Sequence, residues 1–306
     1  MEPAIRTEGL TKIYRSGFWR IPYTGLSDLD LEVPAGTSYG FIGPNGAGKT
    51  TAIKTLMSLQ RATRGRAWIH GIEIPRPESR RRLGFLPERP YFYEHLTARE
   101  FLDFYARLAD VRPTERSERV ATLLERVDLA RFRDVPLGKF SKGMLQRAGL
   151  AQAMIGDPDL LVLDEPMSGL DPLGRALVRD VIQAERRAGK TVFFSSHVLS
   201  DVEAICDRVA IVVGGRLRGQ GTLPELLGRT VGHVDCTFAY KEGAQGERLE
   251  QIRLAPDAVD AHVDAARRAG ASIVSVVPAQ RTLEEVLLDE VERARPVDAK
   301  RMGILA

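Results

Sequence analysis

Cysteines and long apolar runs are scarce in this chain of 306 residues. Its two cysteines, Cys206 and Cys236, are too few for a disulfide framework, and their separation excludes a CxxC zinc motif. No apolar run approaches the roughly 18 residues that a membrane-spanning helix requires. The first residues are not followed by the apolar core of a signal peptide. We therefore expect a protein of the reducing cytoplasm.

A large excess of either charge is also missing. The formal net charge is only +3, and 43% hydrophobic with 28% charged residues is the composition of an ordinary globular protein. Arginines cluster at 61–66 and 80–82, but such short runs are typical of solvated surfaces. We therefore expect no nucleic-acid partner. The length suffices for one large domain with a smaller appendage.

The most informative stretch is GPNGAGKT at residues 43–50, which matches the phosphate-binding P-loop pattern. The apolar segment Tyr39–Ile42 before it predicts a buried strand, and Thr51–Leu59 after it has helical spacing. Glycines let the backbone turn its N–H groups toward an anion, and the positive end of the helix points at the same anion. The candidate phosphate-binding residues are Gly43, Pro44, Asn45, Gly46, Ala47, Gly48, Lys49, Thr50 and Thr51.

Two of these side chains have a predicted role in catalysis or metal binding. Lys49 supplies a cation for the terminal phosphates of a nucleoside triphosphate, and the Thr50 hydroxyl can ligate magnesium. Downstream, the apolar strand Leu160–Leu163 delivers Asp164 and Glu165 at its carboxyl end, which borders the ligand crevice in an open parallel sheet. We expect Asp164 to hold magnesium, directly or through water. Glu165 is then the candidate that polarises a water for attack on the γ-phosphate.

The rest of the pattern is an alternating β/α chain with a helical insert at about 91–158. Thr97 with Glu100 predicts a capping box in the insert. Near the N-terminus, strands are expected at Ile5–Leu10 and Asp28–Val33, with a long hairpin tip or loop at 14–27. The character changes after residue 222. The pattern therefore predicts an α/β domain at 1–222 and a small α+β accessory domain at 223–306.

With these motifs in this order, the chain resembles the ATP-binding subunits of ABC transporters over roughly residues 4–222. The resemblance implies a P-loop NTPase core of the ABC ATPase type with an antiparallel β subdomain and an inserted helical subdomain. ATP and Mg²⁺ are the implied substrate and cofactor.

The resemblance also implies roles for five residues outside the P-loop. Tyr14 lies where the family places an aromatic ring against adenine. His197 matches the switch histidine that contacts the γ-phosphate and the attacking water. Ser141 and Gly143 belong to the family signature, which presents a helix N-terminus to a phosphate. Asp171 matches the loop that passes between two ATPase subunits.

Two motifs depart from the commonest family pattern, the signature and the segment that contains Glu88. The signature reads Phe-Ser-Lys-Gly-Met, so that Lys142 adds a cation and Met144 replaces an amide. Glu88 stands where the family usually has glutamine; it keeps an oxygen for magnesium or water and adds a negative charge. Both variants resemble those of bacterial ABC exporters, in which the ATPase and the membrane subunit are separate chains.

The resemblance therefore implies an ATP-hydrolysing subunit that powers transport, in the direction of export, through a separate integral membrane permease. ATP would lie in a homodimer between the P-loop of one copy and Ser141–Gly143 of the other. The subunit would be cytoplasmic and peripheral on the inner face of the cell membrane. One alternative is a soluble ABC-type ATPase that acts on nucleic acid or the ribosome. A P-loop kinase is another, although it leaves Ser141, Asp171 and His197 without a role.

Overall fold

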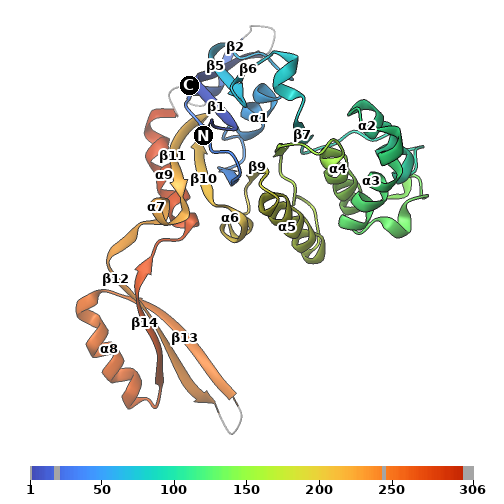
Figure 1. Ribbon diagram of the computed structural model, residues 1–306. Helices are drawn as coiled ribbons and strands as arrows, with labels where there is room; N and C mark the ends of the chain where they lie inside the picture. Colours follow the sequence, from blue (N-terminus) through green and yellow to red (C-terminus); the bar gives the residue numbers. More distant parts are fainter. Residues whose placement is uncertain (1, 17–20, 243–245, 299–306) are drawn as a thin grey trace. The chain divides into compact units, whose positions relative to one another are not determined.

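The computed structural model describes residues 2–16, 21–242 and 246–298. Backbone contacts divide the chain into two units (Figure 1). The larger unit comprises the chain up to Leu223 and from Asp289 onward, and the smaller unit is Pro224–Leu288. None of the helices in these described ranges is long and apolar enough to cross a membrane.

A six-stranded sheet forms the centre of the larger unit, with the order β11-β10-β4-β9-β8-β7. All neighbours are parallel except the hairpin of β10 and β11. Every residue of β4, β8 and β9 except Thr191 and the serines is apolar or glycine, and all are buried, because helices cover the faces of a parallel sheet. The strands are β4 (Ser38–Ile42), β7 (Leu83–Leu86), β8 (Leu160–Leu163), β9 (Thr191–Ser196), β10 (Arg208–Val213) and β11 (Arg216–Thr222).

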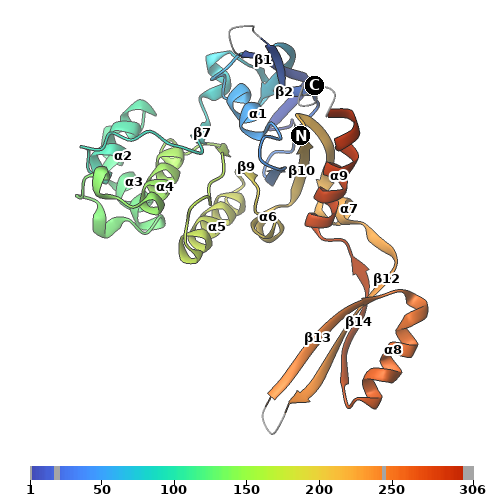
Figure 2. The ribbon, with the colours of Figure 1, turned by 180° about the vertical axis from the view of Figure 1, so that it is seen from behind.

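Helices pack on both faces of this sheet (Figures 1 and 2). Helices α5 (Pro172–Arg187) and α6 (Leu199–Ile205) contact β4 and β9 on one face. On the other face, α1 (Lys49–Leu56) lies between this sheet and the antiparallel sheet, and one apolar core includes residues of all three. The predicted helix at 51–59 thus begins two residues earlier, directly after Gly48, whose φ of 104° ends the loop.

The antiparallel sheet has the path β2-β1-β5-β6, and β3 also pairs with β1. The expectation of one strand at Asp28–Val33 is wrong, because Asp28 has a φ of 51° and the chain breaks between β2 and β3. The Thr7 hydroxyl donates to Leu29 O (2.7 Å) and accepts from Leu31 N–H (2.8 Å), beside the backbone bond from Thr7 N–H to Leu31 O (2.8 Å). The strands are β1 (Ile5–Ser16), β2 (Ile21–Leu29), β3 (Glu32–Val33), β5 (Arg64–Ile69) and β6 (Ile72–Glu73).

The helical insert contains α2 (Ala98–Leu108), α3 (Pro113–Arg126) and α4 (Lys142–Met154). Short 3₁₀ turns lie at Pro77–Arg80 before the insert and at Ala130–Phe132 and Leu137–Lys139 within it. The predicted capping box of Thr97 and Glu100 at α2 is confirmed. Ser141 is the N-cap of α4, where its hydroxyl accepts from Met144 N–H at 3.2 Å. The three helices share a core of aromatic and aliphatic side chains.

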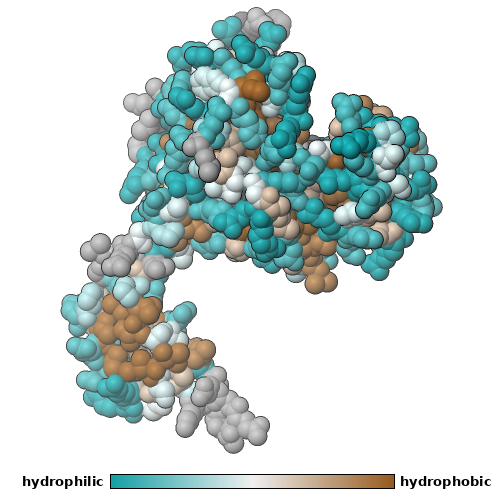
Figure 3. All heavy atoms as spheres, in the orientation of Figure 1, coloured by the Kyte–Doolittle hydropathy of each residue, from teal (hydrophilic) through white to brown (hydrophobic). Residues whose placement is uncertain are grey.

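The smaller unit is a three-stranded antiparallel sheet of order β13-β12-β14, with α8 on one face. β13 is absent from the pattern-based expectations, because charged residues are frequent in it. Figure 3 shows apolar side chains gathered on this unit, where Val274, Val276 and Val277 of β14 are about half exposed. The elements from here to the C-terminus are α7 (Leu223–Leu227), β12 (Arg229–Glu242), β13 (Gly246–Leu254), α8 (Pro256–Arg268), β14 (Ser272–Gln280) and α9 (Leu283–Asp298).

Candidate nucleotide-binding site

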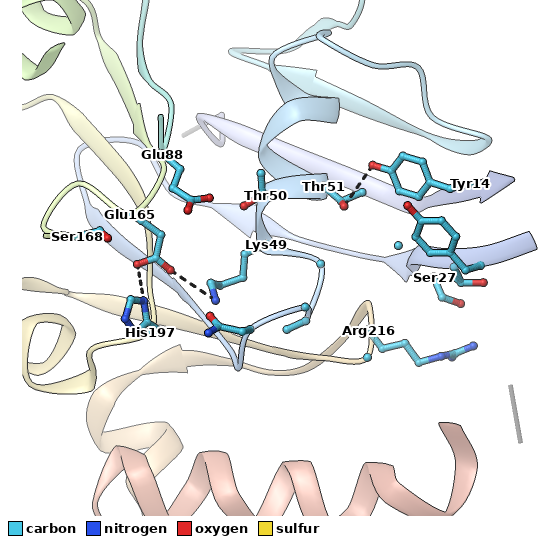
Figure 4. A pocket seen from close by; sticks show the side chains of 18 residues that line it. Tyr14, Ser27, Lys49, Thr50, Thr51, Glu88, Glu165, Ser168, His197 and Arg216 are labelled. Atoms are coloured by element: carbon cyan, nitrogen blue, oxygen red, sulfur yellow. Dashed lines mark hydrogen bonds and ion pairs between the residues drawn. The ribbon is translucent and has the colours of Figure 1, made fainter. Parts of the chain in front are cut away.

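A cavity of about 810 Å³ opens at the carboxyl ends of β4, β8 and β9 (Figure 4). Each of these strands is followed by a side chain that lines the cavity. Lys49 begins the helix after β4, Glu165 follows β8 and His197 follows β9. The lining residues are Tyr14, Tyr23, Thr24, Gly25, Ser27, Asn45, Gly46, Ala47, Gly48, Lys49, Thr50, Thr51, Glu88, Glu165, Ser168, His197, Gly214 and Arg216.

The glycine-rich loop between β4 and α1 is packed so closely that it requires glycine. A Cβ on Gly43 would lie 2.1 Å from Val212 O, and one on Gly48 would lie 2.4 Å from Gly25 O. The first N–H groups of α1 follow Gly48 at the pocket wall, where a helix N-terminus favours an anion. The loop therefore has the geometry of a phosphate cradle.

The Lys49 side chain is 93% buried and is held at the floor of the cavity. Its ammonium donates to Gly43 O at 2.7 Å and to Pro44 O at 3.3 Å. Glu165 Oε1 lies 3.6 Å from the same ammonium. Three oxygens thus surround the buried Lys49 ammonium, and each of these contacts can be replaced by a contact to another oxygen.

Glu165 lies between Lys49 and His197 (Figure 4). Its Oε2 is 2.7 Å from Nδ1 of His197, which is about half exposed at the mouth of the cavity. Glu165 has a φ of 51°, in the left-handed region, and its N–H donates to the Ser195 hydroxyl at 2.9 Å. The backbone therefore turns sharply after β8 and aims this carboxylate along the cavity floor.

Asp164, one residue earlier, is buried behind the cavity. Burial raises the pKa of its carboxyl group, hydrogen bonds from Ser195 and Thr50 oppose that rise, and the charges of Glu88 and Glu165 add to it. The Ser195 hydroxyl donates to Asp164 Oδ1 at 2.6 Å. Asp164 is thus a buried carboxylate near two other carboxylates, and none of the groups that shift its pKa is a cation.

The oxygens of Thr50, Asp164 and Glu88 fit a magnesium ion, because this hard cation takes oxygen ligands. In the described ranges, no group of three or more His, Cys, Asp or Glu residues could hold a metal ion. That is the usual situation for magnesium, which is held by one or two carboxylates together with substrate phosphates. The donor set therefore suits Mg²⁺ that arrives with a phosphate chain.

The structure brings most of the predicted site residues together. Tyr14, Glu88, Glu165, His197 and residues 45–51 line the cavity. Gly43 and Pro44 contact Lys49 through their carbonyl oxygens without lining it. Asp164 lies behind the wall and is hydrogen-bonded by Ser195 and by Thr50, which lines the cavity.

Three predicted residues are placed elsewhere. Ser141 caps α4 and Gly143 lies in the first turn of that helix, beside Leu170. Asp171 caps α5, where its carboxylate accepts from Gly174 N–H at 2.9 Å. Among the described residues that line the cavity, none comes from these two helix N-termini. Within one chain, the signature helix and the P-loop do not form one site.

Several residues at the site escaped the sequence analysis, among them the lining residues Tyr23, Ser27, Ser168 and Arg216 and two residues behind the wall. Ser195 is fully buried and bridges Asp164 and the backbone of Glu165. Gln146 of α4 is buried and donates to Pro166 O at 3.2 Å, which ties the signature helix to the turn after Glu165. The available signal for Ser195 was a hydroxyl near the end of a fully buried and largely apolar strand, whereas Gln146 carried none.

The opposite end of the cavity is aromatic and polar. The rings of Tyr14 and Tyr23 stack with centroids 4.9 Å apart and planes at 15°. Ser27 and Arg216 lie at this end, away from Glu165 and His197 (Figure 4). The turn between β10 and β11 connects both ends, because Gly215 N–H donates to Ala47 O (2.9 Å) and Gly215 O accepts from Ser27 N–H (2.8 Å).

A strand, a glycine-rich loop and a helix that begins with lysine, beside carboxylates at the end of a neighbouring strand, define a P-loop nucleoside-triphosphatase. The chain belongs to the family of ABC transporter ATP-binding proteins. A sequence profile of the family described as ABC transporter matches residues 26–168. An uncharacterized ABC transporter ATP-binding protein of Synechocystis sp. is 41% identical over 298 residues, covering 94% of this chain and 84% of that protein.

Two further relatives have names that mention a compound. The bacitracin transport ATP-binding protein BcrA of Bacillus licheniformis is 39% identical over 220 residues, covering 71% of this chain and 69% of that protein. The daunorubicin/doxorubicin resistance ATP-binding protein DrrA of Streptomyces peucetius is 36% identical over 278 residues, covering 87% of this chain and 82% of that protein.

Solved structures agree with the fold. An ATP binding subunit of an ABC transporter matches with a TM-score of 0.66 and 31% identity, covering 73% of this chain and 91% of that chain. A dimeric ATP-binding cassette bound to ADP and phosphate also matches with a TM-score of 0.66, at 22% identity, covering 72% and 98%. The predicted α/β fold of the ABC ATPase type is confirmed.

Proposed function

We propose that this chain hydrolyses ATP to power export through a separate integral membrane protein. The observation that carries the proposal is the position of the Glu165 carboxylate, held between the Lys49 ammonium and the His197 ring on the floor of a P-loop cavity. This arrangement places a base, a cation and a polar ring around one point where a γ-phosphate and a water can meet.

In the proposed binding step, the N–H groups of the loop and of the first turn of α1 receive the β- and γ-phosphates. The Lys49 ammonium turns from the carbonyl oxygens of Gly43 and Pro44 to phosphate oxygens. Thr50, Asp164 and Glu88 would hold Mg²⁺ together with the phosphates, and this ion would supply charge neutralisation. Lys49 is then the mobile cation of the site, since its present partners are neutral carbonyls and one carboxylate.

In the proposed hydrolysis step, Glu165 accepts a proton from a water molecule as that water attacks the γ-phosphorus. The bond between this phosphorus and the β–γ bridging oxygen breaks, giving ADP and phosphate. His197 orients the carboxylate through its Nδ1 and presents its other ring nitrogen toward the mouth of the cavity, because the ring is half exposed. Ser195 fixes the turn that aims Glu165.

A second copy of the chain completes the proposed site. Ser141 and Gly143 lie at the N-terminus of α4, outside the chain's own cavity, so that their hydroxyl and N–H groups are available to a phosphate bound by another copy. Asp171, at the N-terminus of α5, belongs to the loop expected to pass between the two copies. ATP between the P-loop of one copy and α4 of the other would join two polar surfaces. Loss of the γ-phosphate removes charge from that junction and loosens it. The dimeric state of the solved cassette bound to ADP and phosphate is in keeping with this arrangement.

The membrane partner is proposed to dock between the helical insert and the loop of Glu88. Large aromatic side chains are exposed there, with Tyr91 at 84%, Tyr93 at 43% and Phe104 at 40%. Exposed aromatic side chains of this kind are typical of a protein–protein interaction site, and the apolar end of a helix from another protein could bury them. The relatives named for bacitracin transport and for daunorubicin/doxorubicin resistance favour export as the direction. The chain would then be peripheral on the inner face of the membrane.

Glu165→Gln tests the proposal directly. Turnover of Mg–ATP should fall by about 10²–10⁴-fold, because the base is lost, while ATP binding is retained. Size-exclusion chromatography with light scattering should then show a dimer that forms with ATP and dissociates without it. Glu118→Gln, a charge change on the exposed side of α3, is the matched control. Turnover near the wild-type rate in Glu165→Gln would remove Glu165 from this role.

The docking surface is tested by purification of the chain in mild detergent from its native host. The wild-type chain should co-purify with an integral membrane protein, and Phe104→Asp should lose it while keeping its basal ATPase rate. Co-purification with nucleic acid or ribosomes, and with no membrane protein, would support the soluble ABC-type alternative instead.

A further inference from the structure

A second cavity, of about 570 Å³, lies between the end of α1 and the antiparallel sheet. Its walls come from the segment after α1, from β1, β5 and β6, and from the 3₁₀ turn at Pro77–Arg80. The volume falls within the range of about 300–1,000 Å³ that is typical of small-molecule sites. Among the described residues, none lines both this cavity and the nucleotide cavity. The second cavity is therefore a separate place for a ligand.

Part of the lining of the second cavity is apolar. Leu10 of β1 and Ala67 of β5 are each 1% exposed and belong to the apolar core of the larger unit. Ala62 and Ile74, which also line the cavity, pack against that core. A ligand with an apolar group of a few carbon atoms would remove this surface from water.

Three arginines and one glutamate also line the cavity, and two of these four residues neutralise each other. Arg66 donates to both carboxylate oxygens of Glu73, from Nε to Oε1 at 2.9 Å and from Nη2 to Oε2 at 3.1 Å. Its guanidinium also lies 4.8 Å from the centroid of the Trp68 ring. The hydrogen bond from Arg66 lowers the pKa of Glu73, so that this carboxylate stays charged. The charge of the cavity is then set by the two remaining arginines.

Arg61 and Arg80 have no carboxylate partner in the described ranges. The backbone carbonyl of Arg61 accepts from the Lys12 ammonium at 2.8 Å, but its guanidinium has no hydrogen bond or ion pair to a described residue. Arg80 Nη1 donates to the carbonyl oxygen of Pro75 at 3.3 Å, which is a neutral group. The cavity thus presents two guanidinium charges that are free to bind an anion.

The Ser58 side chain is a further polar group that lacks a partner. Its hydroxyl oxygen is buried without a hydrogen-bond partner among the described residues, and Ser58 lines the cavity. A buried hydroxyl group without a partner is unfavourable. A rotation of this side chain about its Cα–Cβ bond would let the hydroxyl donate to an oxygen of a ligand.

One feature of the cavity, the C-terminal end of α1, disfavours an anion. The carbonyl groups at this end already have donors, because Lys54 O accepts from Leu59 N–H at 2.9 Å and Thr55 O accepts from Ser58 N–H at 3.0 Å. A helix end carries about half an elementary charge, whereas Arg61 and Arg80 carry one full charge each. The two arginines therefore decide the sign of the ligand.

We propose that the second cavity binds a small phosphate monoester that carries an apolar substituent. A phosphate monoester has a charge of about −1.5 to −2 at neutral pH, which matches the guanidinium groups of Arg61 and Arg80. Guanidinium groups bind phosphate oxygens through pairs of parallel hydrogen bonds. The apolar substituent would lie against Leu10, Ala67 and Ile74. The ester can be a soluble molecule or the headgroup of an anionic lipid, because both present the same phosphate chemistry.

Calorimetry with hexyl phosphate, on the full chain in a buffer without phosphate, tests this assignment. The wild type should bind hexyl phosphate at least about tenfold more tightly than inorganic phosphate, which lacks the apolar group. Arg61→Gln and Arg80→Gln should each weaken hexyl phosphate binding by about 10- to 100-fold, because a charge-assisted hydrogen bond is lost. Arg81→Gln, at an exposed arginine outside the cavity, is the matched control and should leave the affinity unchanged.

Three results would overturn the inference. The first is the absence of saturable binding up to about 10 mM hexyl phosphate. The second is an unchanged affinity in Arg61→Gln, which is decisive even if Arg80→Gln fails to fold, because Arg61 is exposed and its side chain has no partner to lose. The third is binding that is lost in Lys49→Ala and kept in Arg61→Gln, which would place the probe at the P-loop. A chain that binds hexyl phosphate at Arg61 and does not bind ATP would overturn the proposed function alone.

A vesicle flotation assay distinguishes the two sources of the phosphate monoester. The wild type and Arg61→Gln would be mixed with phosphatidylcholine vesicles that contain or lack phosphatidic acid. Flotation that requires both phosphatidic acid and Arg61 would assign the ligand to a lipid headgroup. Binding of hexyl phosphate without flotation would assign it to a soluble ester.

Discussion

Asp164 and Glu185 are two carboxylates of the larger unit that are equally hidden from solvent and differently surrounded. Asp164 is 1% exposed and Glu185 is 2% exposed. Burial alone would raise the pKa of both. It does so for Asp164, whereas the pKa of Glu185 is lowered because hydrogen bonds from Lys190 and Arg126 outweigh its burial.

The difference lies in the cations that the chain supplies. Lys190 Nζ is 2.7 Å from Glu185 Oε2, and Arg126 pairs with the other oxygen, so that α3, α5 and the start of β9 are joined by a neutralised cluster. Among the described residues that act on its pKa, Asp164 has hydrogen bonds from the hydroxyl groups of Ser195 and Thr50, with Glu88 and Glu165 as like-charged neighbours. Glu185 is a structural carboxylate whose charge is balanced in the folded chain. Asp164 has no cation of the chain among the groups that act on its pKa, which is why we propose that a bound cation balances its charge.

Removing the Asp164 charge should separate activity from stability, with the largest effect of the changes considered. We expect Asp164→Asn to lose at least about 10²-fold in Mg–ATP turnover, because a magnesium ligand is lost. The same change should raise the free energy of unfolding by about 1 kcal/mol in magnesium-free buffer at neutral pH, because a buried charge is removed. Urea unfolding and an ATPase assay on one preparation measure both. A lower free energy of unfolding for Asp164→Asn than for the wild type would contradict the view that the Asp164 charge is unbalanced in the folded chain.

Removing the Glu185 charge should have the opposite effect on stability. Glu185→Gln leaves Arg126 and Lys190 without their shared partner and should lower the free energy of unfolding by about 3 kcal/mol, with little change in turnover per folded molecule. A group with a lowered folded-state pKa stabilises the fold fully above its ordinary pKa, about 4.3 for glutamate, and loses that contribution as the pH falls through the lower folded value. The wild-type advantage in urea unfolding should therefore be constant near neutrality and shrink below about pH 4.3. A constant advantage down to pH 3 would refute this account.

Ser195→Ala tests whether the hydroxyl groups around Asp164 position it for a cation. The hydroxyl donates to Asp164 and accepts from Glu165 N–H, so its loss should lower turnover by about 10- to 100-fold and raise the magnesium concentration needed for half-maximal activity. Ser195→Thr keeps the hydroxyl and should recover part of the loss. A defect in Ser195→Ala that leaves the magnesium dependence unchanged would indicate packing alone.

The smallest effect is expected for Glu88→Gln, which restores the residue that the family usually has at this position. Removal of a like charge should bring the pKa of Asp164 closer to its ordinary value and weaken magnesium binding by about three- to tenfold. Titration of ATPase activity with Mg²⁺ at a fixed ATP concentration checks this shift. If Glu88→Gln reached half-maximal activity at a lower magnesium concentration than the wild type, Glu88 would not face the metal.

The parts of this molecule that follow local rules could be predicted from the sequence. The P-loop, the acidic pair at 164–165 and the caps at Thr97 and Ser141 each depend on residues a few positions apart. The break between β2 and β3 could not, because it depends on Thr7, more than twenty residues away in sequence.

Site residues that depend on which strands become neighbours were missed for the same reason. Ser195 acts because β9 lies beside β8, which places its hydroxyl next to Asp164. Tyr23 stacks on Tyr14 because of the register of the β1–β2 hairpin across the bulge near Lys12. The local pattern of hydrophobic residues predicts neither of these strand pairings.

The turn at Gly214–Gly215 has a consequence for anyone who wishes to alter how long this protein retains its nucleotide. It bonds to the P-loop on one side and to the strand that carries Tyr23 on the other, so a single inserted residue there would change the distance between the triphosphate and base ends of the cavity. Such a change touches no group placed in hydrolysis. Nucleotide residence time could thus be engineered independently of the chemistry, through the spacing of two glycines.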